Sequence, residues 1–354
     1  MRGAVVITSG GTGGHMFPAL ALGERLGERG QPALFAVDRR GARYLPETAA
    51  RRHVLAASPS GNPLRRLGAL ALLAAGLVDS LARFLVARPR AVAAFGGYAS
   101  VPTGVAAGLL RIPLLLHEQN AVLGRAHRLL LRFAGVVALT FPSTAGATPS
   151  GERIRVVGNP VRAGFAPAPL PAFSDGLELL VVGGSQGAHA LAEVVPAAVA
   201  SLPSALRANL RVTQQCRPED LEDVRAAYAE LGVAATTETF FADMPERLAR
   251  AHLVVARAGA SSVAELSCVG RPSILVPYPF AADDHQSANA RALEAAGASV
   301  VIDAAAFTSD RLAGELEALL GEPATLADMA GAAAGLARPN AARELADAVL
   351  ELVR

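Results

Sequence analysis

Short apolar runs alternate with longer segments of helical periodicity along most of this chain. Each run is bounded by glycine or polar residues, a pattern that predicts buried strands. In the first half these strands are expected at residues 4–8, 33–37, 91–94, 114–117, 135–139 and 154–157. Helical periodicity occurs over residues 16–29 and about 64–86. This alternation of strand and helix predicts a parallel, doubly wound sheet.

The second half of the chain repeats the alternation. Its strands are expected at residues 177–182, 210–214, 236–240, 253–256, 273–276 and 299–302. The proline-rich residues 166–171 predict a linker, and Pro339 predicts a break between the last two helices. A length of 354 residues also suits two α/β domains. We expect residues 1–161, joined by the C-terminal helix 338–354, to form the first domain and residues 162–337 the second.

A glycine-rich turn follows the first expected strand of each half. Residues 10–14 read Gly-Gly-Thr-Gly-Gly and precede His15, and residues 183–187 read Gly-Gly-Ser-Gln-Gly. Such a turn brings backbone N–H groups to an anion at the positive end of a helix. Two copies predict two Rossmann-like domains that face a central cleft and bind a phosphate-bearing ligand. Thr12 and Ser185 occupy matching positions, where a hydroxyl contacts phosphate or caps a helix, and the duplication favours phosphate.

The amino-acid composition excludes or disfavours several classes of protein and of site. All 33 basic side chains are arginine, so a Walker A loop and a Schiff-base lysine are excluded. Cys216 and Cys268 are far apart and lack metal-ligand spacing, which argues against a disulfide framework or a zinc site. This cysteine usage favours a reducing cytoplasm, and no signal-peptide pattern occurs at the N-terminus. A dehydrogenase is disfavoured, because Met16 stands at the third glycine position of G-x-G-x-x-G, although Asp38 ends the second strand.

The charge of the chain differs in sign between its halves. Residues 1–160 hold 19 arginines and 7 acidic residues, whereas residues 161–354 hold 14 arginines and 24 acidic residues. A basic half favours an anionic partner, such as a phosphorylated substrate or acidic lipid, with a polarised solvated surface as the alternative. Nucleic acid is disfavoured, because aromatic residues make up only 5% of the chain and no nucleic-acid-binding motif occurs.

Residues 63–86 form a long apolar segment flanked by arginines. Asp79 and the glycines Gly68 and Gly76 argue against a transmembrane span. Two interpretations remain open. The segment is either an interfacial helix, with its apolar face in a membrane and arginines on anionic headgroups, or an ordinary core helix.

Polar residues gather where strands are expected to end, the edge at which ligands bind in open α/β sheets. His15 closes the first glycine loop, where it can act as a general base or bond to the helix start. His117, Glu118, Gln119 and Asn120 directly follow a buried strand, and packing alone does not explain four polar residues there. We therefore expect one of these four to touch a ligand and others to be structural.

Two further polar strings occur in the second half. Arg257 opens a third turn, which leads to Glu265 one turn into a helix. Glu265 either binds both hydroxyls of a ribose or closes a capping box with Ser262, and the spacing fits both. A later polar loop suits sugar hydroxyls, while a metal there has only weak support. The polar residues of this loop are Asp283, Asp284, His285, Gln286 and Asn289.

Taken in order, these strings resemble the MurG family of bacterial UDP-N-acetylglucosamine–N-acetylmuramyl-(pentapeptide) pyrophosphoryl-undecaprenol N-acetylglucosamine transferases. The matching strings lie at residues 10–15, 117–120, 158–162 (Gly-Asn-Pro-Val-Arg), 183–188, 257–265 and 283–289. The resemblance implies a GT-B glycosyltransferase fold of two Rossmann-like domains with parallel sheets. It implies synthesis of lipid II from lipid I for peptidoglycan, by a peripheral enzyme on the cytoplasmic face of the bacterial inner membrane.

The resemblance also implies where the substrates bind. The second domain would hold UDP-N-acetylglucosamine, with Ser185 on a phosphate, the main chain of Phe241 on uracil and Gln286 on the sugar hydroxyls. The helix start would contact phosphate and ribose, the latter through Glu265. Its residues are Ala260, Ser261, Ser262, Val263, Ala264 and Glu265. Further family donor-site positions are matched by Thr12, Gly13, Gly14, Asn120, Arg162 and Arg257. The first domain would hold undecaprenyl-linked lipid I.

The implied reaction is an inverting glycosyl transfer. The 4-hydroxyl of the N-acetylmuramyl unit attacks the anomeric carbon, and UDP leaves. Helix N-termini and backbone amides stabilise the negative charge that develops on UDP. His15 is the first candidate for the base, with His117 or Glu118 behind it. No metal or other cofactor is expected, and the glycine loops lack a neighbouring DxD-type pair. The alternatives are another GT-B enzyme, such as a UDP-N-acetylglucosamine 2-epimerase, and a non-catalytic nucleotide-sugar sensor.

Overall fold

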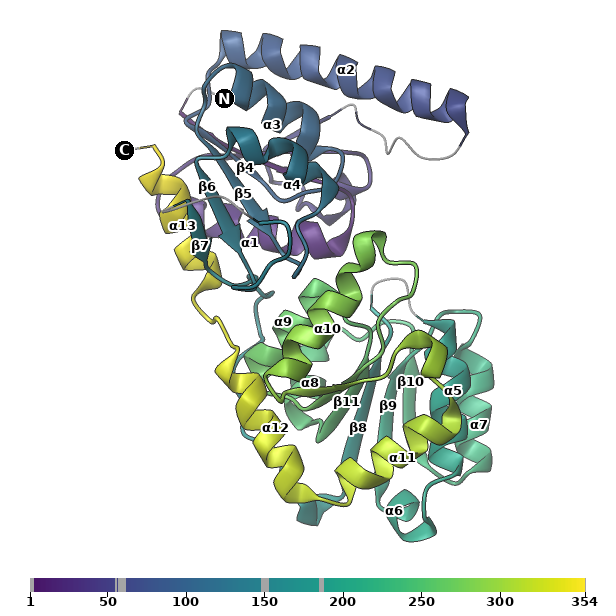
Figure 1. Ribbon diagram of the computed structural model, residues 1–354. Coiled ribbons are helices and arrows are strands. Elements are labelled where there is room, and N and C mark those ends of the chain that lie inside the picture. Colours follow the sequence, from purple (N-terminus) through teal and green to yellow (C-terminus); the bar gives the residue numbers. More distant parts are fainter. Residues whose placement is uncertain (1–2, 55, 57–61, 148–152, 185–187, 354) are drawn as a thin grey trace. The chain divides into compact units, whose positions relative to one another are not determined.

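The chain divides into two compact units, seen in the computed structural model of Figure 1. The first unit comprises Met1–Arg162 and Arg338–Arg354, and the second comprises Ala163–Ala337. The structure describes all residues except 1–2, 55, 57–61, 148–152, 185–187 and 354. Each unit is built on its own parallel sheet with helices on the two faces, the arrangement expected from alternating strands and helices.

The first unit contains a seven-stranded parallel sheet. Its strands are β1 (Val5–Ser9), β2 (Ala33–Val37), β3 (Arg51–His53), β4 (Ala91–Ala94), β5 (Leu114–Glu118), β6 (Val136–Leu139) and β7 (Ile154–Val156). Their order across the sheet is β3-β2-β1-β4-β5-β6-β7. The order reverses at β1, and a doubly wound sheet binds ligands beside such a switch point.

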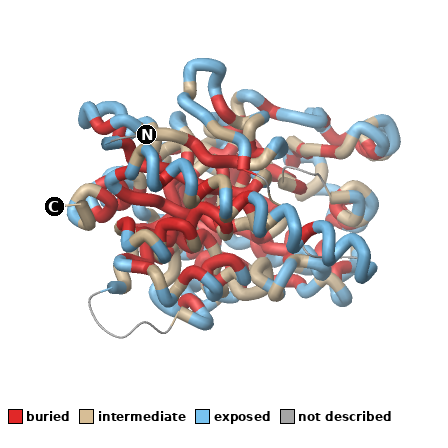
Figure 2. The backbone as a smooth tube through the Cα atoms, turned by 90° about the horizontal axis from the view of Figure 1, so that it is seen from above, coloured by how far each residue is buried: buried red, intermediate tan, exposed pale blue. Residues whose placement is uncertain are grey.

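Alternate side chains of the first sheet enter two different cores. The helices of this unit are α1 (Gly13–Glu28), α2 (Pro63–Val86), α3 (Ser100–Leu109), α4 (Arg125–Leu130) and α13 (Ala341–Glu351). Val5 and Ile7 pack with α1 and α13, while Val6 lies in the core formed with α2, α3 and α4. Figure 2 shows the backbone buried at the centre and exposed toward the outside. The sheet is therefore apolar on both faces, as a parallel sheet requires.

The second unit contains a six-stranded parallel sheet of order β10-β9-β8-β11-β12-β13. Its strands are β8 (Leu177–Val182), β9 (Leu210–Gln215), β10 (Ala234–Glu238), β11 (Leu253–Ala256), β12 (Ser273–Leu275) and β13 (Ser299–Val301). Its helices are α5 (His189–Ala200), α6 (Ser204–Ala208), α7 (Leu221–Glu230), α8 (Met244–Arg250), α9 (Ala260–Val269), α10 (His285–Ala295), α11 (Ser309–Leu320) and α12 (Pro323–Gly335). Residues of α5, α7, α11 and α12 share one apolar core with β8 and β9.

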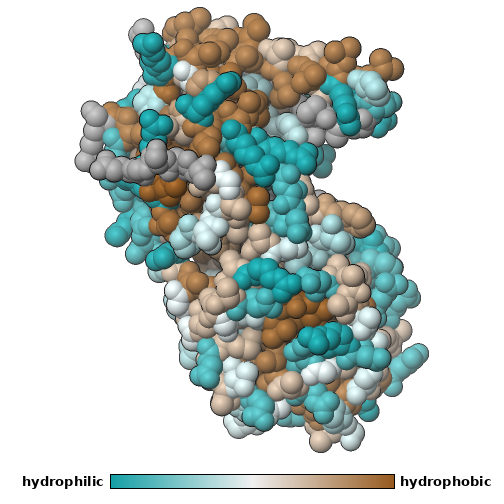
Figure 3. All heavy atoms as spheres, in the orientation of Figure 1, coloured by the Kyte–Doolittle hydropathy of each residue, from teal (hydrophilic) through white to brown (hydrophobic). Residues whose placement is uncertain are grey.

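Helix α2 lies on the surface of the first unit, so its interpretation as an ordinary core helix is wrong. Only a narrow face is buried, through Ala69, Gly76, Ser80 and Phe84. Most of its leucines and valines are exposed, and Figure 3 shows hydrophobic side chains gathered over this part of the first unit. Within the described residues, α2 is the one helix long and apolar enough to span a membrane, by length and composition alone.

The side chain of Arg52 anchors α2 to the edge of the sheet. Its Nη2 donates to Ser80 Oγ at 2.9 Å, and its guanidinium carbon lies 6.0 Å from the centre of the Phe84 ring. Nη1 lies 3.7 Å from a carboxylate oxygen of Asp79. Burial lowers the pKa of Arg52, and Asp79 partly offsets this effect. The buried face of α2 thus contacts Arg52 of β3 and packs against α3, while its opposite face is exposed to solvent.

A buried arginine ties the linker to the second unit. Arg271 is fully buried, and burial lowers its pKa to about 10. Its guanidinium donates to the carbonyls of Ala168 and Pro169 in the linker and of Leu248 and Ala249 at the end of α8. These bonds give additional donors to carbonyls in the last turn of α8, where the carbonyl of Leu248 also accepts from the N–H of Ala251. The proline-rich stretch is therefore a fixed part of the second unit.

Candidate active site

Two glycine-containing turns meet at the carboxyl edge of the first sheet. The N–H of Gly10 after β1 donates to the carbonyl of Gly96 after β4 at 2.9 Å. A Cβ atom on Gly10 would lie 2.8 Å from the Cα of Gly97, and Gly97 has a φ of +72°. Only glycine permits this backbone contact at these positions. The glycine loop therefore lies against the end of the neighbouring strand β4.

Thr12 and His15 form a hydrogen-bonded pair at the start of α1. Thr12 occupies the N-cap position with extended backbone angles, but its side chain does not cap the helix. Its Oγ1 instead lies 2.7 Å from Nδ1 of His15. The interpretation of the Thr12 hydroxyl as a simple helix cap is therefore wrong. Gly13 and Gly14 form the first residues of α1, so their amides lie at its positive end.

The carboxylate of Glu118 organises the loop that follows β5. Its Oε1 accepts hydrogen bonds from the N–H and side-chain amide of Asn120, at 3.0 and 3.2 Å. Its Oε2 accepts from the N–H of Gly124 and lies 2.8 Å from Nδ1 of His127. Burial alone would raise the pKa of Glu118, but the charge and hydrogen bond of His127 and the two amides outweigh it and lower the pKa to about 2. A carboxylate so stabilised is a poor proton acceptor.

Both ring nitrogens of His117 are engaged within the protein. Nε2 lies 2.9 Å from the carbonyl oxygen of Gly158, and Nδ1 lies 3.0 Å from Nε2 of Gln119. Nε2 therefore donates to Gly158, while Nδ1 accepts from Gln119. Burial lowers the pKa of His117 to about 4. The neutral ring joins the loop after β5 to the loop after β7, and neither nitrogen is left to take a proton from a substrate.

His127 completes this network and was not predicted from the sequence. It is buried in α4, pairs with Glu118 and lies 3.3 Å from the carbonyl oxygen of Ala94 through Nε2. A Cβ atom on Gly96 would lie 3.3 Å from Nε2 of His15 and 3.4 Å from Cε1 of His127. The two imidazoles thus flank Gly96. A single histidine in a helix of six residues carries no sequence signal for this role.

In the second unit, the turn after β11 leads into α9. The N-cap of α9 is Gly259 and the helix begins at Ala260, so Ser262 lies within the first turn. A capping box of Ser262 with Glu265 is therefore wrong. The described residues Ala260, Ser261, Ser262, Val263 and Ala264 form the first turns of α9, and Glu265 follows them, partly buried. This part of α9 presents helical amides, the arrangement suited to an anion.

Two side chains fix the turn that precedes α9. Nη1 of Arg257 donates to the carbonyls of Val276 and Pro277, each at 3.1 Å, and burial lowers the pKa of Arg257. Nδ2 of the buried Asn289 donates to the carbonyl of Ala258 at 3.1 Å. The ends of β11 and β12 and the start of α10 are thereby held together. Arg257 and Asn289 have structural partners here in addition to any ligand.

The loop between β12 and α10 places Gln286 beside Tyr278. Oε1 of Gln286 accepts a hydrogen bond from the N–H of Tyr278 at 2.9 Å. Asp283 and Asp284 have φ values of +53° and +50°, an unfavourable conformation outside glycine. Oδ1 of Asp284 accepts from the hydroxyl of Ser287 at 2.6 Å. Within the described ranges, no three histidine, cysteine or acidic side chains form a metal-binding group.

The remaining predicted site residues have distinct surroundings. Ser185 lies outside the described residues, while the preceding Gly184 has a φ of +81° and no described atom within 4 Å of the position where a Cβ would lie. Phe241 is buried, with the guanidinium carbon of Arg247 4.2 Å from the centre of its ring, so only its main chain suits a ligand contact. In the first unit, the guanidinium carbon of Arg162 lies 5.0 Å from the centre of the Phe17 ring, next to the glycine loop.

Comparisons with known proteins agree along almost the whole chain. Residues 5–139 match the glycosyltransferase family 28 N-terminal domain, and residues 178–345 match its C-terminal domain. A Paramagnetospirillum magneticum protein is 47% identical, covering 99% of this chain and 96% of its own length. A Rhodospirillum centenum protein is 49% identical, covering 98% and 93%. Both are named UDP-N-acetylglucosamine–N-acetylmuramyl-(pentapeptide) pyrophosphoryl-undecaprenol N-acetylglucosamine transferase.

The fold agrees with the same group of proteins. The crystal structure of MurG from Acinetobacter baumannii superimposes with a TM-score of 0.82 at 30% identity, covering 98% of this chain and 99% of the MurG chain. The expected GT-B fold is confirmed, because both units carry the parallel sheets of this class. With its full-length similarity to the curated transferases and its two family 28 domains, this chain belongs to the MurG family of glycosyltransferases.

Proposed function

We infer that this chain is an inverting glycosyltransferase that moves N-acetylglucosamine from UDP-N-acetylglucosamine to the 4-hydroxyl of the N-acetylmuramyl unit of lipid I. The products are lipid II and UDP. The observation that carries the inference is the 47% and 49% identity to curated transferases of this activity over nearly the full chain. A 2-epimerase is less supported, because the curated relatives carry the transferase name.

The second unit binds the donor in this proposal. The amides at the start of α9 meet the diphosphate, and Glu265, one helical turn further, accepts both ribose hydroxyls. The main chain of Phe241 meets uracil, and its buried ring, stacked with Arg247, supports that arrangement. The sugar hydroxyls are bound by Gln286, already fixed by the N–H of Tyr278. Ser185 and Arg257 complete the phosphate contacts.

The first unit binds lipid I and supplies the base. When Nδ1 of His15 carries a proton, it donates to the Thr12 hydroxyl and leaves the lone pair of Nε2 to accept the proton of the attacking 4-hydroxyl. The amides of Gly13 and Gly14 favour the pyrophosphate of the lipid. As the bond to the anomeric carbon breaks, the negative charge that develops on UDP is stabilised by helix N-termini. Thr12, Asn120 and Arg162 position these groups.

Docking at the cytoplasmic face of the inner membrane supplies the lipid substrate. The exposed apolar face of α2 enters the headgroup region of the bilayer, and arginines of the first half bind anionic lipids. Arg65 and Arg66 lie in the first turn of α2, beside the exposed Leu64 and Leu67. Attachment by one such surface is reversible and peripheral.

One turnover experiment tests the assignment. The full chain is incubated with UDP-N-acetylglucosamine, with or without a lipid I analogue, and UDP and glycosylated acceptor are measured by chromatography. Equal amounts of UDP and glycosylated acceptor, formed only when the acceptor is present, are expected. A 2-epimerase would change the donor sugar without acceptor, and a sensor would bind the donor without turnover. Either result would overturn the proposed function.

A further inference from the structure

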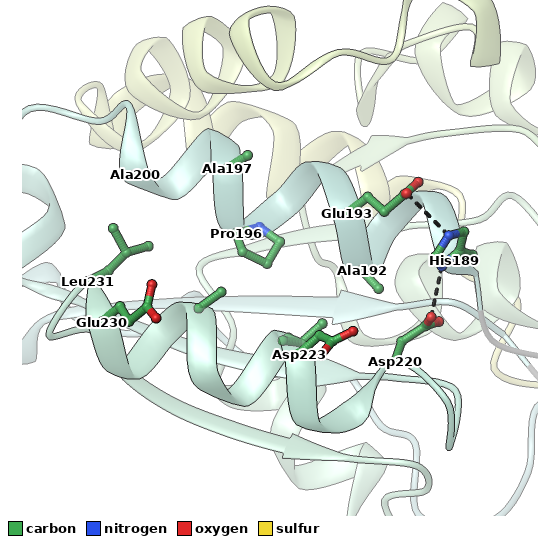
Figure 4. Close-up of a pocket in the computed structure, with 12 residues that line it drawn as sticks. His189, Ala192, Glu193, Pro196, Ala197, Ala200, Asp220, Asp223, Glu230 and Leu231 are labelled. Atoms are coloured by element: carbon green, nitrogen blue, oxygen red, sulfur yellow. Dashed lines mark hydrogen bonds and ion pairs between the residues drawn. The ribbon is translucent and has the colours of Figure 1, made fainter.

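An open groove runs between α5 and α7 on the second unit. Its cavity volume is about 360 Å³. Figure 4 shows Ala192, Pro196 and Ala197 of α5 along one side and Leu231, just beyond α7, at one end. The apolar part of the lining consists mainly of alanine, proline and valine side chains, so another helix can approach α5 and α7 closely. Pro196 has no N–H, so the carbonyl of Ala192 within this lining lacks its usual helical donor.

Carboxylates lie along the full length of this α5–α7 groove. His189 lies at one end, with its ring nitrogens 3.2 Å from Glu193 and 2.8 Å from Asp220 (Figure 4). Asp223 and Glu230 follow along α7, and both are exposed. No arginine occurs among the described residues that line the groove, but Arg217 beside it donates to Asp220 at 2.6 Å, so Asp223 and Glu230 supply most of the acidic rim. The surface therefore combines an apolar floor with an acidic rim, in the half of the chain that carries net negative charge.

We propose that the α5–α7 groove is a docking site for a basic amphipathic helix of a partner protein. An apolar face with small residues accepts the leucine-type side chains of such a helix, spaced three and four residues apart. Lysine or arginine on its flanks meets the carboxylates of the rim, which favours association and fixes orientation. With 12 residues, α5 is ~18 Å long, so the groove accommodates about three turns of the partner. This function is separate from glycosyl transfer.

Direct binding tests the proposal with the full-length protein. The probe is a fluorescein-labelled amphipathic peptide of leucine and lysine, as long as α5, and the comparison peptide has glutamate in place of lysine. Fluorescence anisotropy should show binding of the lysine peptide but not of the glutamate peptide. The affinity for the lysine peptide should fall as the salt concentration rises. The double variant Asp223→Arg/Glu230→Arg should weaken binding roughly ten-fold or more, because two attractions become repulsions. Ala197→Trp should also abolish binding by filling the groove, without a change in charge.

A matched variant separates the groove from general acidity. Glu222→Arg/Glu238→Arg makes the same change in net charge at exposed positions outside the lining. It should change the affinity by less than about two-fold at physiological salt. Equal weakening by both double variants, equal binding of the glutamate peptide, or no binding of the lysine peptide would each overturn the proposal. Circular dichroism melting verifies that every variant is folded, and transferase turnover should remain at the wild-type level.

Discussion

The Thr12 hydroxyl oxygen lies 2.7 Å from Nδ1 of His15, at the start of the first helix. When Nδ1 of the neutral ring donates this bond, Nε2 is unprotonated, which is the tautomer needed by a base. Both ring nitrogens of His117 are engaged, by Gly158 and Gln119, and the Glu118 carboxylate is occupied by four hydrogen-bond contacts. This contrast makes His15 the strongest proposed base of the three.

Replacing His15 by alanine should lower kcat by about 10²–10⁴-fold, the range of a positioned general base. Donor affinity measured without acceptor should remain unchanged, because the ring acts on the attacking hydroxyl. Thr12→Val should give a smaller fall in kcat by removing the oxygen that orients Nδ1, while Thr12→Ser should retain activity. Steady-state kinetics and calorimetric titration of the donor provide these values. Nearly normal turnover of the His15 variant would place the base elsewhere.

Replacing Glu265 by alanine should raise the KM for the donor strongly. Loss of two charge-assisted hydrogen bonds to the ribose costs on the order of 2–4 kcal/mol, or about 30- to 1,000-fold in affinity. The melting temperature should change little, since Glu265 is not part of a capping box. Kinetics with UDP-N-acetylglucosamine and thermal melts measure the two effects together. An unchanged KM with a large fall in melting temperature would assign Glu265 to structure alone.

The stability of the first unit should depend on His117 in mildly acidic solution. Burial lowers the pKa of His117 from 6.5 to about 4. Between these pH values the unfolded chain binds a proton that the native protein does not, so the free energy of unfolding falls as pH falls. This contribution is complete above pH 6.5 and is lost toward pH 4, with a magnitude of roughly 3 kcal/mol at most.

The variant His117→Gln tests this dependence, because its amide can still donate to Gly158. Urea unfolding between pH 4 and 7 should show a flatter profile for the variant. The pKa of Glu118 is lowered from 4.5 to about 2, so its own contribution is present above pH 4.5 and is lost only at lower pH. Parallel profiles of wild type and variant above pH 4.5 would contradict the neutral, buried state of His117.

Replacing Leu64, Leu67 and Leu70 by serine should weaken binding to anionic liposomes. These three side chains are 79%, 66% and 54% exposed, whereas Leu77 packs against the core of the first unit. Turnover of the lipid-linked acceptor should fall, while turnover of a short-chain, water-soluble acceptor should be retained. Liposome flotation at low and high salt measures binding, which should decrease as charges are screened. Unaltered flotation by a folded variant would exclude α2 as the membrane surface.

The strands were largely predictable because each central strand is a short apolar run between glycine or polar residues. The edge strand β3 was missed, since Arg51, Arg52 and His53 carry no apolar pattern. Helix α3 was missed as well, because its Pro102, Gly104 and Gly108 interrupt helical propensity, and tertiary packing compensates for them. Strand β10 lies two residues before its predicted position, at Ala234–Glu238.

The positions of polar residues at strand ends were predictable, but their pairing was not. The cluster 117–120 stood out because four polar residues follow a buried apolar run. The partner of His117 is Gly158, 41 residues away, and the partner of Glu118 is His127, in a separate helix. Hydrogen bonds between distant strands depend on sheet order, which one sequence does not display. The three-dimensional structure was therefore needed to distinguish the proposed base, His15, from His117 and Glu118, which have structural partners.

Helix α13 belongs to the first unit although it follows the whole second unit in the chain. Its Leu345, Ala346 and Val349 are fully buried in the core that α1 and β1 share. During synthesis, the second unit leaves the ribosome before this helix does. The sheet that begins at Val5 must therefore wait, with the part of one apolar face beside α1 uncovered, until residues 338–354 arrive. Translation starts with the first unit, but the second unit is the first that can complete its fold.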